Sequence, residues 1–293
     1  MRKGLFLIAG ATGTTGGVAV AELLSQSHRV RALVHREDAR AEHLRSIGAE
    51  TVKGDLLNLD EIRAAMEAID GAYFVYPFKE GLIEAAAFFA QAAREADVKS
   101  IVNMSQRSAR REAKSHAARD HFITEQLFDW SGVPSTHLRP TFFAEWLIYQ
   151  HVPGWSVKEG VLRFPLGNGR HAPIAGEDQG RVIAGLLANP NGHEAKVYPL
   201  FGPIELDHYQ IAEKLTKTLG KSFVYQPMTI PEFRVLMESG GVSSRIVQHI
   251  ECVAQDYQDG IFAGTNDVVE RITGRKPLTV EEFVEKHRSK FHS

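Results

Sequence analysis

The sequence has 293 residues and a formal net charge of −2, so it is long enough for a buried core and lacks the basic excess of nucleic-acid-binding domains. The hydrophobic fraction of 43 % and the charged fraction of 24 % are ordinary for a globular protein. The single cysteine, Cys252, excludes an intrachain disulfide framework. We therefore expect a globular protein of a reducing compartment that does not contact nucleic acid directly.

The apolar stretches of the chain are short. The run at residues 5–9 ends at a glycine turn, which makes it too short for the apolar part of a signal peptide. No apolar stretch approaches the roughly 18 residues that are needed to cross a bilayer. We expect a cytoplasmic protein without membrane association.

The first half of the chain alternates short β-like runs with segments of helical periodicity. Apolar strands that alternate with helices are typical of a parallel sheet covered on both faces, and right-handed crossovers then give a doubly wound, Rossmann-type α/β fold. The predicted strands are residues 5–9, 29–34, 50–53, 72–75, 100–104 and 135–138, and the predicted helices are residues 17–25, 59–66, 82–96 and 113–130.

The alternation ends near residue 140, where proline, glycine and aromatic residues become frequent. We predict a Rossmann domain over residues 1–140 and a smaller, mostly helical substrate-side region over residues 141–293. No flexible linker separates the two, so they need not be independent domains. This region is expected to contain helices at 179–187, capped by Asp178, at 208–219, from Pro231 onward and at 280–287, with strands at 196–200 and 223–226.

A glycine-rich turn follows the first predicted strand. Gly10, Gly13 and Gly16 have the spacing G-x-x-G-x-x-G directly before a helix, which lets the backbone approach a pyrophosphate and aims free N–H groups at it. A P-loop is excluded because no Gly-Lys-Ser/Thr follows. A turn that only packs helix on sheet is the alternative. Further hydroxyl donors are expected from Thr12, Thr14 and Thr15.

The end of the second predicted strand indicates which dinucleotide binds. An NAD site usually places an acid there, but this strand ends in His35 and Arg36. A cation at this position suits the 2′-phosphate of NADP(H), so NADP(H) is favoured over NAD(H). A solvated surface role for Arg36 is the alternative. After the third strand, Asp55 and Leu56 are expected to contact adenine, although Asp55 also suits a loop or helix cap.

These motifs resemble those of the NmrA-like family of atypical short-chain dehydrogenase/reductases. The similarity lies in residues 10–17, 31–34 and 54–56, together with residues 273–277 and 279–283 near the C-terminus. The resemblance implies a Rossmann fold and an NAD(P) cofactor. It leaves the reaction open, because the family includes quinone oxidoreductases, triphenylmethane-dye reductases and non-catalytic redox sensors.

One departure concerns catalysis. Ordinary short-chain dehydrogenases use Tyr-x-x-x-Lys, whereas alignment on Glu125 places Ala117 and His121 at those positions. An electron-poor acceptor needs little acid assistance, so His121 is the expected catalytic residue, either bonding the nicotinamide ribose or protonating the product. A helix histidine without a chemical role is the alternative.

Loops after the later strands are further candidates, because ligands bind at the carboxyl edge of a doubly wound sheet. The resemblance places Ser105 at the family's catalytic serine and the turn after residue 139 against the nicotinamide. Loop packing, strand capping and core burial are the alternatives for these residues. The expected cofactor-lining residues are Tyr76, Pro77, Phe78, Ser105, Pro140, Thr141 and Phe143, with Trp146, Tyr149 and Trp155 as additional aromatic surface.

Two functions remain open at this stage. The first is an NADPH-dependent oxidoreductase whose partner is a small, flat, electron-poor acceptor such as a quinone. The second is a non-catalytic NADP(H) sensor that binds a protein partner. A homo-oligomer is compatible with either. No metal site is predicted, because the 13 histidines form no Cys–His cluster or His-x-x-x-His motif with an adjacent acid.

Overall fold

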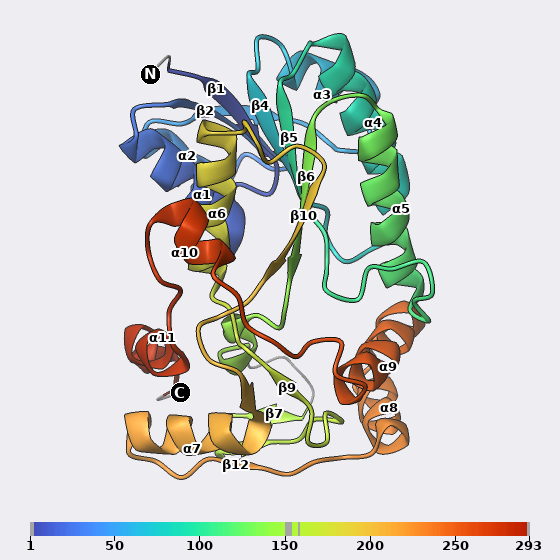
Figure 1. Cartoon of the computed structure of the whole chain (residues 1–293), viewed down its shortest axis with the longest axis vertical. Coiled ribbons are helices and arrows are strands. Elements are labelled where there is room, and N and C mark those ends of the chain that lie inside the picture. The colour runs from blue at the N-terminus through green and yellow to red at the C-terminus, as the bar shows by residue number, and fades with distance from the viewer. Residues whose placement is uncertain (1–2, 150–153, 158, 292–293) are drawn as a thin grey trace.

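A seven-stranded parallel sheet forms the larger part of the molecule (Figure 1). The computed structural model describes residues 3–149, 154–157 and 159–291. The strand order is β10-β6-β5-β4-β1-β2-β3, and every pair is parallel. The bounds are β1 (Leu5–Ile8), β2 (Arg29–Val34), β3 (Glu50–Lys53), β4 (Gly71–Phe74), β5 (Ser100–Met104), β6 (Ser135–Pro140) and β10 (Lys196–Leu200).

Burial on both faces explains why the central strands read as continuous apolar runs. All four residues of β1 and of β4 are buried, as expected for strands covered on two sides. The Rossmann-type doubly wound sheet predicted from the sequence is therefore confirmed.

Helices cover the two faces of the sheet in separate groups (Figure 1). One group packs around α1 and α6, and the other around α4 and α5, with an apolar core beneath each. The first group is α1 (Thr14–Ser25), α2 (Ala39–Ser46), α6 (Gly176–Ala188) and α10 (Val268–Thr273), and the second is α3 (Leu59–Ala65), α4 (Leu82–Glu95) and α5 (His116–Trp130).

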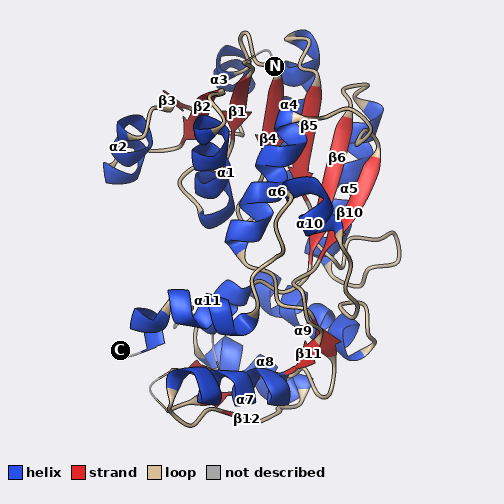
Figure 2. Ribbon diagram, turned by 60° about the vertical axis from the view of Figure 1, so that its left-hand side comes forward, coloured by secondary structure: helices blue, strands red, loops and turns tan. Residues whose placement is uncertain are grey.

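A smaller lobe, formed by the later part of the chain, has its own apolar core and is mostly helical (Figure 2). Its helices are α7 (His208–Leu219), α8 (Ile230–Ser239), α9 (Ser244–Gln258), α11 (Val280–Lys286) and the short 3-10 helices η1 (Ala144–Leu147) and η2 (Arg288–Phe291). Its two-residue strands are β7 (Trp155–Ser156), β8 (Val161–Leu162), β9 (Arg170–His171), β11 (Leu206–Asp207) and β12 (Val224–Tyr225).

The chain beyond residue 140 contributes to both parts of the molecule. Strand β10 pairs with β6 in the large sheet, and α6 packs against α1. The two strands expected after residue 140 are present, but only the second one belongs to the smaller lobe. The division at residue 140 stays a prediction, with residues 176–200 and 268–273 packing on the Rossmann sheet.

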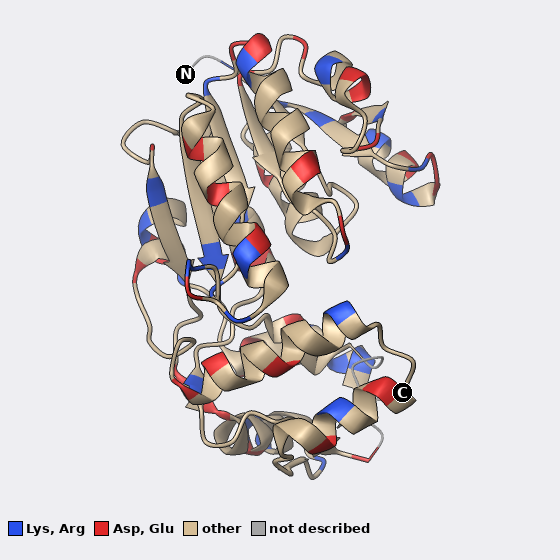
Figure 3. Ribbon diagram, turned by 90° about the vertical axis from the view of Figure 1, so that its right-hand side faces the viewer, with Lys and Arg blue, Asp and Glu red and all other residues tan. Residues whose placement is uncertain are grey.

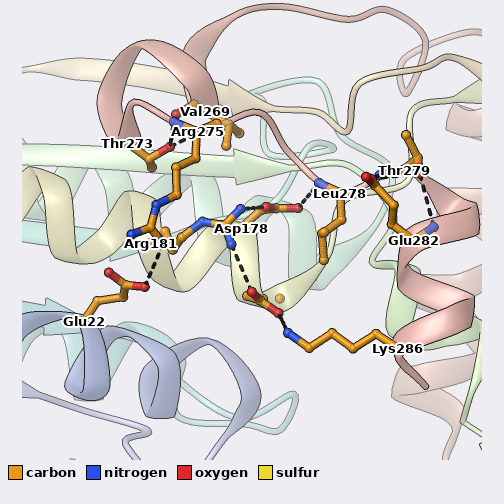
Figure 4. A network of polar contacts seen from close by, with 12 residues as sticks. Glu22, Asp178, Arg181, Val269, Thr273, Arg275, Leu278, Thr279, Glu282 and Lys286 are labelled. Atoms are coloured by element: carbon orange, nitrogen blue, oxygen red, sulfur yellow. Dashed lines mark hydrogen bonds and ion pairs between the residues drawn. The ribbon is translucent and has the colours of Figure 1, made fainter. Parts of the chain in front are cut away.

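Asp178 has a different role from the helix cap that the sequence suggested. Helix α6 begins at Gly176 with Ala175 at its N-cap, so Asp178 lies within the first turn. Its buried carboxylate accepts a hydrogen bond from the guanidinium of Arg181 and one of 3.0 Å from the backbone N–H of Leu278. These contacts join α6 to the segment before α11 (Figure 4).

No helix in the described part of the chain is long and apolar enough to cross a membrane. In the view of Figure 3, acidic and basic residues are interspersed over both parts of the molecule, and neither sign forms a continuous face.

Candidate functional site

The glycine turn is shaped by close backbone contacts. Gly10 has φ +61°, and a Cβ on it would lie 2.5 Å from Cγ1 of Val75. A Cβ on Gly16 would lie 2.3 Å from the carbonyl oxygen of Gly10. Gly13 is the N-cap of α1 and has φ −93°, which any residue can adopt. Glycines 10 and 16 are therefore needed by the fold, whereas a Cβ on Gly13 would meet only the carbonyl oxygen of Gly10, at 3.2 Å.

The first turn of α1 contains no acidic residue, so nothing opposes an anion at its N-terminus. Beside it lies the glycine-turn cleft, which encloses about 1010 Å³ of space partly continuous with solvent. Among the residues expected from sequence, the cleft is lined by Gly10, Thr12, Gly13, Thr15, His35, Asp55, Leu56, Tyr76 and Pro77, and it also includes Leu33, Gly54, Val75 and Lys79.

Two residues of the turn, Thr14 and Gly16, do not line the cleft. Gly16 is buried beneath the turn. The methyl group of Thr14 approaches Gly176 at the start of α6, where an added Cβ would lie 2.6 Å from Thr14 Cγ2. Thr15 shares a hydrogen bond of 3.2 Å with the buried Tyr73 hydroxyl. The threonines therefore tie the turn to its surroundings as well as to the cleft.

Ion pairing at the end of β2 leaves one arginine unpaired. Glu37 pairs with Arg45 at 2.6 Å, and Asp38 pairs with Arg40 at 2.6 Å while capping α2. Arg36 is exposed and has no ion pair within the described part of the chain. It does not line the glycine-turn cleft. The two acids that follow Arg36 are thus neutralised by other cations.

His35 and Asp55 face each other within the cleft. The His35 Nδ1 and Asp55 Oδ2 atoms are 4.0 Å apart. Asp55 also accepts a hydrogen bond of 2.9 Å from the backbone N–H of Leu57, while Asn58 caps α3. Asp55 is therefore a loop aspartate whose side chain borders the cleft.

The segment after β4 links the cleft to α9. The Tyr76 hydroxyl donates to the carbonyl oxygen of Glu80 at 3.0 Å, which fixes the ring at the cleft wall. The exposed ring of Phe78 lies outside the cleft lining and packs on His249 with ring centroids 4.5 Å apart. His249 in turn shares a 2.8 Å hydrogen bond with Ser115, the N-cap of α5.

His121 is half-buried on α5, and its Nδ1 atom has no hydrogen-bond partner among the described residues. Burial lowers its pKa to about 4, against the smaller opposing effects of Glu125 and Asp120. The imidazole is therefore neutral at neutral pH, so it can give or accept a hydrogen bond but does not hold a spare proton. Glu125 is occupied by a bidentate pair with Arg139.

Sequence reasoning missed His249, and it also missed Leu33, Gly54, Val75 and Lys79 of the cleft. Burial, with a smaller effect of the neighbouring His121, lowers the pKa of His249 to about 3. The apolar positions Val247, Ile250 and Val253 have helical spacing and would have predicted α9. The contact of His249 with Phe78 depends on tertiary packing and has no sequence signal.

Several buried polar atoms at the carboxyl edge of β5 and β6 are unpartnered. The hydroxyls of Ser105 and Thr141 have no hydrogen-bond partner among the described residues, and neither has that of Thr124 on α5. Pro140, the last residue of β6, is also buried. Because buried polar groups are normally satisfied, these atoms are candidates to bind a ligand or water.

An apolar cavity lies where the turn after β6 meets the smaller lobe. It is lined mainly by aromatic and aliphatic side chains, with the two imidazoles of His171 and His208. Phe143 and Trp146 line it, Tyr149 is half-buried nearby in the chain, and the side chain of Trp155 lies outside the described residues. The remaining lining residues include Phe142, Leu147, Phe164, Pro165, Leu166, Ile211, Phe233 and Ile250.

No group of three or more His, Cys, Asp or Glu side chains in the described ranges is arranged to hold a metal ion. The glycine turn, the cleft beside it and the parallel sheet define a Rossmann-type α/β protein. Residues 2–284 match the NmrA-like family, and the chain belongs to this family. The resemblance seen in the sequence motifs is confirmed.

Individual relatives align along nearly the whole chain. The chain is 28 % identical to the NAD(P)H azoreductase of Xenophilus azovorans over 98 % of this chain and 99 % of that protein. The structure of an NADPH-dependent quinone oxidoreductase from Escherichia coli in complex with NADPH has a TM-score of 0.86 at 23 % identity, covering 97 % of this chain and 99 % of that one. The negative transcriptional regulator NmrA in complex with NAD has a TM-score of 0.84 at 16 % identity, covering 98 % and 95 %.

Proposed function

We propose that the chain is an NADPH-dependent oxidoreductase that reduces a small, flat, electron-poor acceptor such as a quinone. The observation that carries this proposal is the aromatic cavity at the turn after β6. This turn follows a strand of the same sheet whose first turn borders the glycine-turn cleft. The names of an azoreductase and a quinone oxidoreductase among its relatives support the same class of reaction.

The cleft fits a dinucleotide on its own features. The first turn of α1 offers free backbone N–H groups without a competing acid, and Gly13 leaves room for a pyrophosphate. Leu33 and Leu56 provide apolar walls, and Asp55 provides a hydrogen-bond acceptor for adenine. The unpartnered hydroxyls of Ser105 and Thr141 would complete the far end of the site.

The end of β2 favours NADP(H) over NAD(H). Both acids after Arg36 are already paired with arginines, so neither repels a phosphate strongly. Arg36 is the unpaired cation there and would hold the 2′-phosphate, with His35 beside it.

Bound NADPH would supply a hydride, and reduction of a quinone to a hydroquinone consumes that hydride together with one proton, which solvent can provide. The chain has alanine at position 117 and histidine at 121 in place of a tyrosine–lysine pair. The neutral His121 can orient a ribose or an acceptor by a hydrogen bond, but it is a weak acid catalyst at neutral pH. This arrangement suits acceptors that are reactive without strong protonation.

The test is NADPH oxidation, followed by absorbance, with benzoquinone, menadione and, as a contrasting acceptor, cyclohexanone. We expect turnover with the quinones and none with cyclohexanone, because a saturated ketone needs an acid to accept hydride. NADPH should be used faster than NADH. Absence of quinone-dependent NADPH loss in protein that still binds NADPH would refute the reductase proposal.

A second candidate is an NADP(H)-binding regulator that acts through a protein partner. The missing tyrosine and lysine favour it, and so does the similarity to a transcriptional regulator bound to NAD. This candidate predicts NADPH binding without turnover of any acceptor in the panel, so the same experiment separates the two.

A further inference from the structure

The wall of the apolar cavity contains a buried His–Tyr–His cluster that the proposed chemistry does not use. The Tyr257 hydroxyl lies 2.7 Å from Nδ1 of His171 and 3.2 Å from Nδ1 of His208. The two imidazoles stack with ring centroids 5.4 Å apart. All three side chains are buried, and both histidines line the cavity.

Hydrogen counting in this cluster leaves two arrangements of the histidine tautomers, and the two distances favour one of them. The Tyr257 hydroxyl has one hydrogen, so it donates to one Nδ1 atom and accepts from the other. O–H···N bonds are generally shorter than N–H···O bonds. We therefore assign the 2.7 Å contact as donation by Tyr257 to His171, and the 3.2 Å contact as donation by His208 Nδ1–H to Tyr257.

This assignment leaves one donor and one acceptor for the cavity. His171 then bears its hydrogen on Nε2, whereas His208 has a free lone pair on Nε2. Neither Nε2 atom has a hydrogen-bond partner in the described ranges. Burial lowers the pKa of His171 well below the usual value and that of His208 to about 4, and it raises the pKa of Tyr257, so all three groups stay neutral.

We propose that this cavity binds a planar aromatic ligand through a ring hydroxyl, which donates to His208 Nε2 and accepts from His171 Nε2–H. A phenolic hydroxyl satisfies both atoms at once, whereas an ether or a carbonyl oxygen can satisfy only the donor. The lining is almost entirely apolar apart from the two imidazoles, as is usual for sites that take small aromatic ligands. Phe142, Phe164 and Phe233 supply apolar surface for the ring.

The inference deepens the proposed function, because a hydroxyquinone acceptor or a hydroquinone product carries such a hydroxyl. That connection rests on the proposed function, but the binding site does not. The binding experiment therefore uses ligands that are not reduced and contains no NADPH.

The experiment compares the binding of 1-naphthol and 1-methoxynaphthalene to the full chain by calorimetry. The two probes have the same ring system, but the methyl ether cannot donate to His208. We expect 1-naphthol to bind about tenfold more tightly, which is the effect of one buried hydrogen bond. In His208→Phe the two affinities should differ by less than about threefold, because the acceptor is gone.

Tyr257→Phe and His193→Phe keep the test decisive if His208→Phe fails to fold. Tyr257→Phe keeps the aromatic ring but removes the hydroxyl that holds the tautomers of His171 and His208. It should therefore also reduce the preference for 1-naphthol over 1-methoxynaphthalene. His193 has a comparable 2.8 Å contact with the Tyr198 hydroxyl outside the cavity, and His193→Phe should keep the full preference. Equal binding of the two probes by the parent chain, no binding of either, or an unchanged preference in both cavity variants overturns the proposal. Loss of quinone reduction alone leaves it standing.

Discussion

At the scale of single residues, Arg36 is the side chain on which the choice of cofactor depends. It is exposed, so water screens part of its attraction to a phosphate. We expect Arg36→Ala to weaken NADPH binding by roughly tenfold, or about 1.4 kcal/mol, and to leave NADH binding unchanged. Titration with both cofactors measures this. Arg94→Ala, at an exposed arginine at the end of α4, is the matched control. Equal losses for NADPH and NADH would show that Arg36 does not recognise the 2′-phosphate.

His121 tests whether α5 takes part in the reaction. Because its pKa lies near 4, it acts as a neutral hydrogen-bonding group, so we expect His121→Ala to lower turnover by about tenfold and to change NADPH affinity little. His121→Gln retains hydrogen bonding without titration and should recover part of the loss. The rate should show no break near pH 6.5 that depends on His121.

His116→Ala is the control for this experiment, since His116 begins the same helix and is exposed. Full quinone reduction by His121→Ala would exclude a catalytic role. An equal loss in His121→Gln and His121→Ala, with the midpoint of unfolding lowered in both, would indicate a structural role instead.

At the scale of elements, the glycines between β1 and α1 have different roles. Gly10 and Gly16 shape the turn, whereas Gly13 lies where a pyrophosphate would bind. Gly13→Val keeps an allowed backbone conformation and places a branched side chain at the helix N-terminus, with its Cβ 3.2 Å from the carbonyl oxygen of Gly10. We expect at least a hundredfold loss of NADPH affinity, because the side chain blocks the approach of a pyrophosphate. The unfolding midpoint should fall less than in Gly16→Ala, because the Gly13 Cβ contact of 3.2 Å is less severe than the 2.3 Å contact at Gly16. Calorimetry and thermal unfolding measure the two effects.

Two other glycine substitutions serve as controls for Gly13→Val. Gly240→Val, at an exposed helix end with negative φ, should change neither quantity. Gly16→Ala should lower the unfolding midpoint, since its Cβ would lie 2.3 Å from a carbonyl oxygen. Unaltered NADPH affinity in folded Gly13→Val would remove the cleft from consideration as the cofactor site.

Periodicity predicted the elements whose burial pattern is local. Strand β2 at Arg29–Val34 and helix α7 at His208–Leu219 have the predicted bounds. Periodicity did not predict that Lys196–Leu200 pairs with β6, because the sequence of a strand does not indicate which strand it pairs with. The cleft was predictable because its residues follow strands of one parallel sheet. The role of His249 was not predictable, because its contacts with Phe78 and Ser115 form only when the smaller lobe packs against the Rossmann domain.

At the scale of the whole molecule, buried histidines make stability depend on pH. His171 and His208 are 3 % and 6 % exposed, and both have a pKa below the unfolded value near 6.5. The folded state therefore binds fewer protons than the unfolded state in this range. Their stabilisation is complete above about pH 6.5 and is lost as the pH falls toward 4. For His208 alone the loss between pH 7 and pH 5 is roughly 2 kcal/mol.

Asp178 opposes this trend. Burial raises its pKa to about 6, so the folded state binds the extra proton there and gains stability as the pH falls from 6 to 4. This uptake of a proton offsets only part of the loss from His171 and His208, because two imidazoles oppose one carboxylate. We expect the urea midpoint to fall between pH 7 and pH 5.

Two variants separate these contributions. Asp178→Asn can still accept from the Leu278 N–H and should make the fall with decreasing pH steeper, because the opposing proton uptake is lost. His208→Phe should make the fall shallower by removing one proton-linked group from the cavity wall. Both effects are differences in slope, so they are independent of any constant change in stability that the substitution itself causes. A urea midpoint that stays constant or rises from pH 7 to pH 5 in the parent chain would show that these imidazoles are charged or hydrated in the folded state, and the tautomer assignment around Tyr257 would fail with it.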